Sequence, residues 1–301
     1  MDLGMIGLGR MGAGMTERLV RGGHRVVGFD PNPKARKRVE KIGAECANKL
    51  DVLVKQLAPP RIVWLMVPSG DVTERTIAGL LPLLKAGDTV VDGGNSNYKD
   101  TLRRAQLLAA EGVHLVDCGT SGGVWGLAEG FSMMVGGEKS AVKRLRPIFE
   151  ALAPAANRGW GHVGPPGAGH FTKMVHNGIE YGLIQAYAEG FSIMQHKPEF
   201  ELDLHQVAEI WRYGSVVRSW LLDLTSNALK ENPSLKGIAP HVADSGEGRW
   251  TVAEAIDLDV PAPAITLALL ARLASRDADS FANKLLSAMR NQFGGHAIKK
   301  G

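Results

Sequence analysis

The stretch that most constrains the fold is DLGMIGLGRMGAGMTERLVR, residues 2–21, where an apolar run leads into a glycine-rich turn and then a helical pattern. The turn matches Gly-x-Gly-x-x-Gly through Gly7, Gly9 and Gly12. In a strand–turn–helix unit, the first glycine permits the tight turn, the second lets a pyrophosphate approach the backbone, and the third lets the helix pack on the sheet. The helix N-terminus then offers its amides to the phosphates. The segment therefore predicts a dinucleotide site, with a glycine-rich turn that binds no nucleotide as the alternative.

The choice between NAD and NADP is predicted to depend on Asp30, which closes the second strand pattern, RVVGFD. A carboxylate at this distance from the glycines binds the adenosine ribose and repels a 2′-phosphate, so Asp30 favours NAD. Lys34, Arg36 and Lys37 follow closely and keep NADP as the alternative. The other residues expected to contact the cofactor lie in the glycine loop and after the next two strand patterns: Leu8, Arg10, Met11, Met66, Val67 and Asn95.

The order of strand and helix patterns predicts two domains. Six apolar runs end in Gly, Pro or Asp and read as strands: MIGLG, RVVGFD, IVWLMVP, DTVVDGG, VHLVDCG and FSMMVGG. Helical patterns alternate with them, which is typical of an α/β, doubly wound (Rossmann-type) sheet. After the Gly/Pro segment GPPGAGH the chain reads as helix only, near 169–195, 203–212, 216–229, 262–275 and 277–292. We expect a dinucleotide-binding domain over 1–165 and an all-helical domain for substrate binding and oligomerisation over 166–301.

Composition excludes several classes of protein. The 301 residues are 45% hydrophobic and 22% charged, so the chain can bury a core, and no apolar run is long enough to cross a membrane. Neither a basic leader at the N-terminus nor a basic stripe interleaved with aromatics for nucleic acid is evident. Two cysteines, Cys46 and Cys118, make neither a disulfide framework nor a metal-ligand pattern, which favours a cytoplasmic protein. We expect no metal site, and a net charge of +4 suits a small anionic substrate.

The segment KMVHNGIEYG, residues 173–182, places four polar side chains on one face of a helix. At about 100° per residue, His176, Asn177 and Glu180 all fall within about 60° of Lys173. The other positions are mostly apolar or glycine, so the polar stripe is narrow, as in a buried helix that lines a pocket. A surface Lys–Glu pair beside a stray amide is the alternative.

Two loops after predicted strands add polar groups at the same edge of the sheet, because ligands of doubly wound folds bind beyond the carboxyl ends of the strands. DGGNSNY offers Asn95, and DCGTSGGVWG offers Ser121, Gly122 and Gly123. A Ser-Gly-Gly turn exposes backbone amides that suit a carboxylate. An ordinary tight turn is the alternative.

The motifs DGGNS, DxGxSGG, GPPGAGHFTKMVHNGIEYG, GRWT and RNQFGGH together resemble the 6-phosphogluconate dehydrogenases, over nearly the whole chain. The broader β-hydroxyacid dehydrogenase family shares the glycine loop, the Ser-Gly-Gly turn and the Lys-x-x-x-Asn pair. His176 and Glu180 narrow the match to the decarboxylating, phosphogluconate branch. The resemblance implies oxidative decarboxylation of 6-phosphogluconate, a phosphorylated sugar acid, to ribulose 5-phosphate and CO2 with reduction of NAD or NADP, as in the pentose phosphate pathway and gluconate utilization.

The resemblance also implies a role for each matching residue. Lys173 is the general base and Glu180 the general acid. An amine that burial keeps neutral can take the hydroxyl proton, and once protonated it polarises the ketone, so that CO2 leaves without a metal. Arg290 and His296 lie in a tail that reaches into a neighbouring subunit, which implies a homodimer or homotetramer. The substrate-binding residues carried over are Asn95, Ser121, Gly122, Gly123, His176, Asn177, Tyr181, Arg272, Arg290 and His296, with Tyr181 and Arg272 at the phosphate.

Two departures from the family pattern leave alternatives open. Longer members carry a phosphate-binding lysine where this chain has Ser245, and Arg249 is the nearby replacement. The chain is also shorter than those members and has one copy of the helical unit. A relative of 3-hydroxyisobutyrate dehydrogenase would keep Lys173 and the Ser-Gly-Gly turn but not the phosphate ligands. A non-catalytic dinucleotide-binding sensor would lack the acid–base pair.

Overall fold

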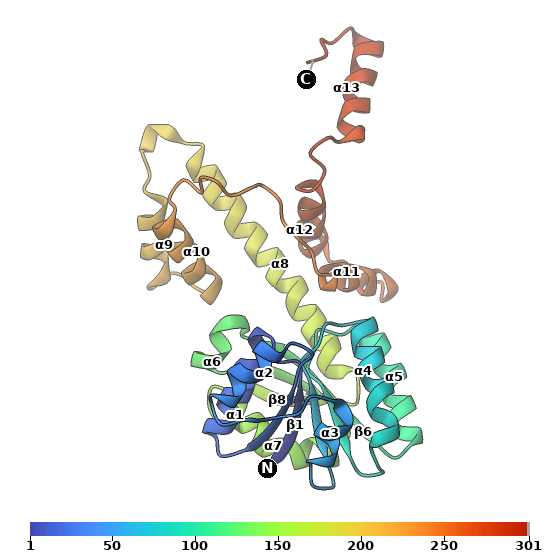
Figure 1. Ribbon diagram of the computed structural model, residues 1–301. Coiled ribbons are helices and arrows are strands. Elements are labelled where there is room, and N and C mark those ends of the chain that lie inside the picture. Colours follow the sequence, from blue (N-terminus) through green and yellow to red (C-terminus); the bar gives the residue numbers. More distant parts are fainter. Residues whose placement is uncertain (300–301) are drawn as a thin grey trace. The chain divides into compact units, whose positions relative to one another are not determined.

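The structure is a computed structural model that describes residues 1–299 (Figure 1). It divides the chain into an N-terminal unit, Met1–His176, and a C-terminal unit, Asn177–Gly301. The division falls inside a helix, α8 (Ala168–Gln195), which begins in the first unit and continues in the second. The domain boundary expected at 165/166 therefore stays a prediction.

The N-terminal unit is built on one eight-stranded sheet with the order β3-β2-β1-β4-β5-β6-β7-β8. Every neighbouring pair is parallel except β6 and β7. The strands are β1 (Asp2–Ile6), β2 (Arg25–Phe29), β3 (Glu45–Cys46), β4 (Ile62–Leu65), β5 (Thr89–Asp92), β6 (His114–Ser121), β7 (Ser132–Gly136) and β8 (Trp160–Gly164). This order is the doubly wound arrangement predicted from the alternating pattern.

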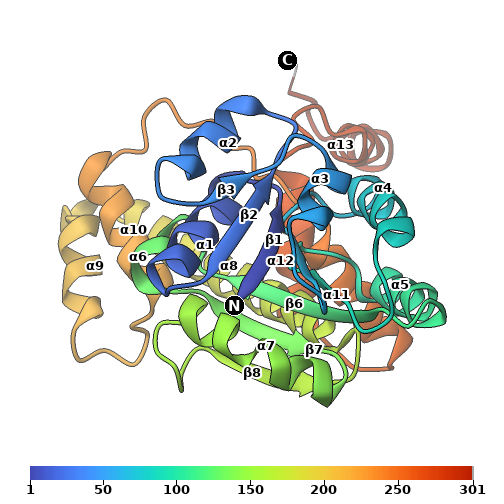
Figure 2. The same ribbon diagram turned by 60° about the horizontal axis from the view of Figure 1, so that its bottom comes forward.

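Helices cover both faces of this sheet, so it has two apolar cores (Figure 2). Met5 and Ile6, successive residues of β1, lie in opposite cores, as the two-residue period of a strand requires. One core includes Leu19 and Phe149, and the other includes Leu108. The helices of this unit are α1 (Arg10–Arg21), α2 (Pro33–Glu40), α3 (Leu50–Lys55), α4 (Asp71–Leu80), α5 (Tyr98–Ala110), the short α6 (Gly126–Glu129) and α7 (Lys139–Leu152).

The secondary-structure elements of the described part of the C-terminal unit are all helices, so the predicted fold class is confirmed for both parts of the chain. After α8 come α9 (Leu204–Arg212), α10 (Trp220–Glu231), α11 (Glu247–Asp257), α12 (Pro263–Ala274) and α13 (Phe281–Gly294). In residues 1–299, no helix is both long enough and apolar enough to span a bilayer.

Several element boundaries differ from the sequence pattern for local reasons. The helix expected from residue 216 begins at Trp220, because the Ser219 side chain caps it by accepting the Leu222 amide. Similarly, the helix expected from residue 277 begins after Ser280, which accepts the amide of Asn283. Helix α11 was not predicted, because its first turn, EGRW, follows a segment rich in Asp, Ser and Gly.

Candidate active site

The glycine loop between β1 and α1 has the geometry that a dinucleotide needs. Gly7 adopts a φ of +91°, and a side chain there would collide with the Met66 carbonyl. Gly12 leaves room for the Gly7 carbonyl against α1. By contrast, a Cβ on Gly9 would meet nothing within 4 Å, and no side chain caps the N-terminus of α1 there. The loop therefore presents an open backbone surface and uncapped amides, which fit a pyrophosphate.

Asp30 holds the glycine loop from the end of β2. Its carboxylate accepts the amide of Leu8 at 2.8 Å and the amide of Asn32 at 2.8 Å. A carboxylate offers about four acceptor positions, so it keeps capacity for ribose hydroxyls. Arg36 donates to the Asp30 carbonyl, and Arg38 donates to the carbonyls of Leu8 and Gly9. One guanidinium group thus contacts Asp30 and a second contacts the glycine loop, and sequence reasoning missed the second, Arg38.

The next strands of the sheet bring the other predicted cofactor residues to the same edge. Met66 and Val67 follow β4, the neighbour of β1, and both would contact a side chain placed on Gly7. Asn95 follows β5, the neighbour of β4, and its side chain is exposed. Arg10 is exposed and Met11 is half-buried at the start of α1. The structure therefore collects all the predicted cofactor residues in the N-terminal unit.

A buried charge network supports the loop that carries Asn95. Asp92, at the end of β5, accepts the Gly94 amide at 3.1 Å, the Ser96 hydroxyl at 2.8 Å and the Arg104 guanidinium at 3.2 Å. Asp92 and Arg104 are both fully buried, and Arg104 also donates to Glu74 at 2.7 Å. The pKa of Glu74 is lowered mainly by its hydrogen bond from the Arg103 guanidinium, and Arg104 lowers it further. This network fixes the backbone on both sides of Asn95, because Gly94 and Ser96 are both tied to Asp92.

The Ser-Gly-Gly turn leaves β6, the neighbour of β5. Ser121 still pairs with Ser132 of β7, while Gly122 and Gly123 adopt φ values of +127° and +51° that favour glycine. Gly122 and Gly123 are partly or fully exposed, so their backbones are accessible. The turn therefore presents amides at the edge that also carries Asn95, as a carboxylate site requires.

Lys173 lies in the second turn of α8, buried against the sheet. Its side chain is 6% exposed, and a Cβ on Gly119 of β6 would lie 2.4 Å from the Lys173 Cβ. The Lys173 Nζ lies 3.2 Å from the Nδ1 of His176, one turn further along the helix. An amine in this position is shielded from water and shares a hydrogen bond with a second nitrogen base. Both features suit a group that takes and returns a proton.

The predicted site residues of α8 that belong to the C-terminal unit lie where this helix packs against α11. Asn177 is buried and Glu180 is half-buried. Gly178 packs against Thr251 of α11, and Gly248 of the same helix lies against the Tyr181 ring, so a Cβ at either glycine would collide. The two glycines let α8 and α11 approach closely, which buries Tyr181 to 5% exposure. Sequence reasoning missed α11 and hence its part in holding Tyr181.

Cationic side chains gather around Tyr181 within the C-terminal unit. The Arg272 guanidinium stacks on the Tyr181 ring at 3.5 Å from its centroid and donates to the Ala243 carbonyl. Beside it, Asp244 accepts from Arg249 at 2.9 Å and from Arg276 at 3.0 Å. The hydrogen bond from Arg249 is the main cause that lowers the pKa of Asp244. Arg272 at Tyr181 and the pair of Arg249 and Arg276 at Asp244 thus supply three guanidinium groups in this region, and guanidinium groups suit a phosphate.

The remaining predicted residues fall in different surroundings. Ser245, at the position of the family's lysine, donates to Glu247, so its hydroxyl serves the start of α11. Arg290 lies in α13 and His296 follows that helix, and both side chains are exposed. The His296 carbonyl accepts from Asn291 at 2.9 Å. Both residues are predicted to act in the active site of a neighbouring subunit. A single chain cannot show that arrangement, so their role stays a prediction.

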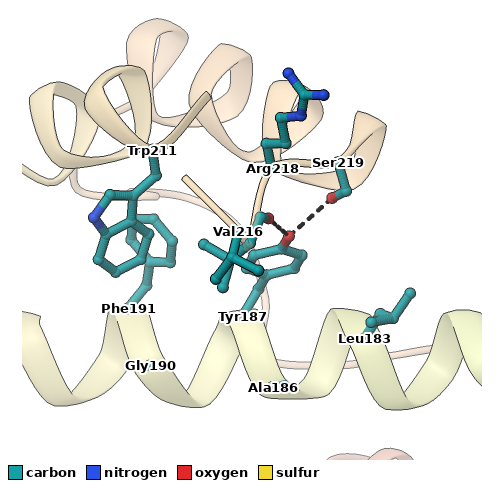
Figure 3. A pocket seen from close by; sticks show the side chains of 10 residues that line it. Leu183, Ala186, Tyr187, Gly190, Phe191, Trp211, Val216, Arg218 and Ser219 are labelled. Carbon is teal, nitrogen blue, oxygen red and sulfur yellow. Dashed lines mark hydrogen bonds between the residues drawn. The ribbon is translucent and has the colours of Figure 1, made fainter. Parts of the chain in front are cut away.

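The C-terminal unit also holds a cavity of about 410 Å³ (Figure 3). Tyr187 of α8 forms its floor, donating to the Val217 carbonyl and bonding the Ser219 hydroxyl at 2.8 Å. Phe191 and Trp211 pack edge to face beside it. The lining is mostly apolar and includes none of the predicted catalytic or substrate residues, so we assign it no chemistry. Across residues 1–299, no group of three or more His, Cys, Asp or Glu side chains could hold a metal ion.

Comparison with known proteins identifies the family. Residues 2–162 match the family model for the NAD binding domain of 6-phosphogluconate dehydrogenase, and residues 169–283 match the model for the C-terminal domain of that enzyme. The NAD(+)-dependent, decarboxylating 6-phosphogluconate dehydrogenase of Haloferax volcanii is 44% identical over 301 residues, covering 100% of this chain and 99% of its own. A Bacillus subtilis protein named as a putative 6-phosphogluconate dehydrogenase is 41% identical over 300 residues, which cover 100% of both chains.

A solved structure gives the same answer for the fold. The 6-phosphogluconate dehydrogenase of Plasmodium falciparum, described with its cofactor NADP+ and its substrate 6-phosphogluconate, superposes with a TM-score of 0.84 at 28% identity. The match covers 100% of this chain and 66% of that longer one. Both domain matches and the full-length relatives show that the chain belongs to the 6-phosphogluconate dehydrogenase family.

Proposed function

We propose that the protein oxidises and decarboxylates 6-phosphogluconate to ribulose 5-phosphate and CO2, with NAD as the preferred cofactor and NADP as the alternative. The open backbone at Gly9 and the uncapped start of α1 fit the pyrophosphate of either dinucleotide. Asp30 supports the preference for NAD, because a 2′-phosphate would bring a second negative charge to that carboxylate. When bound, the nicotinamide supplies the hydride acceptor.

Lys173 is the proposed base for the oxidation. Its Nζ takes the proton from the substrate hydroxyl, and Lys173 is buried where the helix packs against Gly119 of β6, which shields the amine from water. The same group, now protonated, donates a hydrogen bond to the new ketone oxygen and draws electrons toward it while CO2 leaves. The His176 Nδ1, 3.2 Å from the Lys173 Nζ, keeps the amine pointed in one direction.

Glu180 is the proposed acid for the last step. Decarboxylation leaves an enediol, which needs a proton on the carbon that lost CO2. Glu180 lies seven residues after Lys173 on the same helix, about 10 Å along its axis. Base and acid thus belong to one helix, and each acts on a different carbon of one substrate.

The packing of Arg272 on Tyr181 is the observation that carries the choice of a phosphorylated substrate. A 3-hydroxyisobutyrate dehydrogenase would have no use for a guanidinium stacked on a tyrosine beside two further arginines. The planar guanidinium can bind a phosphate with two parallel hydrogen bonds. We place the substrate phosphate at this cluster and its carboxylate at the Ser-Gly-Gly turn, with Asn95, His176 and Asn177 binding its hydroxyls and carboxylate.

The test is absorbance of the reduced nicotinamide with 6-phosphogluconate and either NAD or NADP, beside 3-hydroxyisobutyrate. We expect turnover of 6-phosphogluconate, faster with NAD, and its loss in Lys173→Ala. The matched control is Lys85→Ala, which removes a lysine that lies outside the predicted site. Activity on 3-hydroxyisobutyrate alone would mean that the phosphate cluster was misread.

We also propose that the active unit is a homodimer or homotetramer in which the tail with Arg290 and His296 completes a neighbouring subunit's site. Helix α13 supports this, because Phe281, Leu285 and Met289 share one face at four-residue spacing and are 75%, 47% and 52% exposed. An apolar face of this kind suits burial against another chain.

Mixing inactive variants tests that arrangement. If the tail completes a neighbouring subunit's site, a mixture of Lys173→Ala and His296→Ala chains that is unfolded and refolded together should regain activity. In a mixed oligomer, some sites combine the native Lys173 of one chain with the native His296 of the other. The control pair, Lys173→Ala with Glu180→Gln, should stay inactive, because both residues lie on one helix of one chain. No recovery in the first mixture would place His296 in its own chain's site or outside any site.

A cytoplasmic location is part of the same proposal. Both cysteines, Cys46 and Cys118, are free, and burial raises the pKa of the Cys118 thiol to about 12. Free thiols are typical of a reducing compartment. Fractionation of the native cells, followed by an activity assay of each fraction, checks the location.

A further inference from the structure

Strand β6 places three residues of the DxGxS motif on one face. Successive side chains of a strand point to opposite faces, so Asp117, Gly119 and Ser121 share one. Ser121 has a proposed role at the substrate carboxylate, and Gly119 lies beneath Lys173. Asp117 has no role in the function argued so far, although it is fully buried.

The Asp117 carboxylate binds the first turn of α8. One oxygen accepts the Gly167 amide at 2.7 Å, and the other accepts the His170 amide at 2.8 Å. The first amides of a helix have no partner within the helix, and an anion at this end is also favoured by the helix dipole. Asp117 therefore caps α8 from a strand that lies fifty residues earlier in the chain.

Close packing around the Asp117 carboxylate restricts the position of the first turn of α8. A Cβ on Gly136 of β7 would collide with the Asp117 carboxylate, and a Cβ on Gly169 would lie 2.5 Å from the Met134 carbonyl. The first turn of α8 thus lies directly on the backbones of β6 and β7. A second anchor, the hydrogen bond of 2.7 Å between His170 Nδ1 and the Thr101 hydroxyl, joins the same turn to α5.

We propose that Asp117 is a positioning residue that sets the axial register of α8 on β6, and with it the position of Lys173 relative to the Ser121–Gly123 turn. From Asp117 to Gly119 the strand advances about 6.6 Å, and from His170 to Lys173 the helix rises about 4.5 Å. The Asp117 carboxylate therefore holds the first turn of α8, and Gly119, two residues further along β6, contacts Lys173 in the second turn. Together the two contacts fix the position of the helix along the strand. This inference rests on the proposed function, in which Lys173 is the base.

A buried carboxylate can also stabilise a fold without any effect on a site, and Asp88 is the matched control for that possibility. Asp88 is 1% exposed and accepts the amides of Arg61 at 2.6 Å and Lys85 at 2.9 Å. It lies before β5 (Thr89–Asp92), at the edge opposite to the glycine loop. Asp88→Asn and Asp117→Asn thus both remove a buried charge that binds two backbone amides, at opposite ends of the sheet. Asp88→Asn also removes an ion pair with the Arg61 guanidinium at 3.2 Å, so it is the stricter control for a loss of stability.

The experiment compares kcat, the two KM values and amide hydrogen exchange in both variants. We expect Asp117→Asn to lower kcat on the order of 100-fold, because a shift of about 1 Å in a catalytic group costs that much. The KM for the dinucleotide should not change, since its predicted contacts follow β1, β2, β4 and β5, whereas Asp117 binds the first turn of α8. Amides of residues 167–173 should exchange faster in Asp117→Asn. Asp88→Asn should lose stability to a similar extent and keep wild-type kcat and wild-type exchange over residues 167–173.

The outcomes separate this inference from the proposed function. An Asp117→Asn variant with wild-type kcat, or with unchanged exchange over residues 167–173, overturns the positioning role. A wild-type enzyme without turnover contradicts the proposed function, while the exchange data still decide whether Asp117 holds α8. If Asp117→Asn does not fold, Asp117→Glu keeps the charge but is one methylene longer, and it should lower kcat for the same reason. Wild-type kcat in that variant also overturns the inference.

Discussion

Replacing Gly119 with alanine tests how closely the strand and the catalytic helix must approach. The added Cβ would lie 2.4 Å from the Lys173 Cβ and 2.7 Å from the Gly169 carbonyl. Non-bonded carbons settle at about 3.5–4.0 Å, so the helix and the strand must separate by about 1.1–1.6 Å. Neither neighbour can simply turn away, because one atom is the first side-chain carbon and the other belongs to the backbone.

The displacement gives the expected magnitudes. A misplacement of about 1 Å in a reacting group costs on the order of 100-fold in rate, and overpacking costs about 1–3 kcal/mol of unfolding free energy. We therefore expect Gly119→Ala to lower kcat by about two orders of magnitude and to unfold at lower denaturant concentration. The KM for the dinucleotide should stay close to that of the wild type, because the glycine loop lies on β1.

The assay is reduced-nicotinamide absorbance at saturating substrates, beside a urea unfolding curve. Gly161→Ala is the matched control, because Gly161 lies in β8 of the same sheet and a Cβ there meets nothing within 4 Å. It should keep both kcat and stability. A Gly119→Ala enzyme with kcat within about threefold of the wild type would falsify the claim that this contact sets the position of Lys173.

Four further outcomes follow from other parts of the molecule. Asp30→Asn should raise kcat/KM with NADP relative to NAD by about tenfold or more, since like charges opposed at a binding site cost several kcal/mol, and initial rates with each cofactor check this. Arg272→Lys keeps the charge but loses the planar group, so the KM for 6-phosphogluconate should rise about tenfold with no change in the KM for NAD. Because Arg249 holds the pKa of Asp244 below its usual value near 4, the pair should stabilise the fold above about pH 4 and lose that effect as the pH falls through the lowered pKa. Urea midpoints of Asp244→Asn and the wild type should therefore differ at neutral pH and converge in acid. Burial raises the pKa of Cys118 to about 12, so iodoacetamide at pH 8 should label it only after unfolding, as mass spectrometry of both states would show.

Features that depend on residues close together in the sequence could be predicted from it. The glycine loop, the strand before it and the helix after it form one continuous segment, so their spacing alone indicated the site. The stripe of Lys173, His176 and Glu180 needed only the period of a helix, and α8 has that period throughout. The doubly wound sheet followed from the alternation of patterns, because each strand and helix buries its own apolar face.

Features that join distant segments could not be predicted. The contact of Arg38 with the glycine loop joins residues about thirty positions apart, and nothing in the pattern of α2 marks that arginine. The network of Asp92, Arg104 and Glu74 joins β5, α5 and α4, and each residue alone reads as an ordinary charged position. The Asp117 cap is invisible for the same reason, since its partners are backbone amides that any sequence provides.

The alternation of side chains between the two faces of β6 also limits which sequence changes a protein of this kind can accept. This strand is hydrogen-bonded to β5 on one side and β7 on the other, so its backbone cannot slide. A single inserted or deleted residue between Asp117 and Ser121 would reverse the facing of the strand on one side of the change, so that either the cap or the substrate ligand would point to the opposite face of the sheet. Changes in this strand can therefore accumulate only as substitutions at constant length, whereas a change of length after Gly123 leaves the spacing between Asp117 and Ser121 intact. Relatives that act on different substrates should therefore differ in the turn after Ser121 and in α11. The five residues 117–121 should keep their spacing.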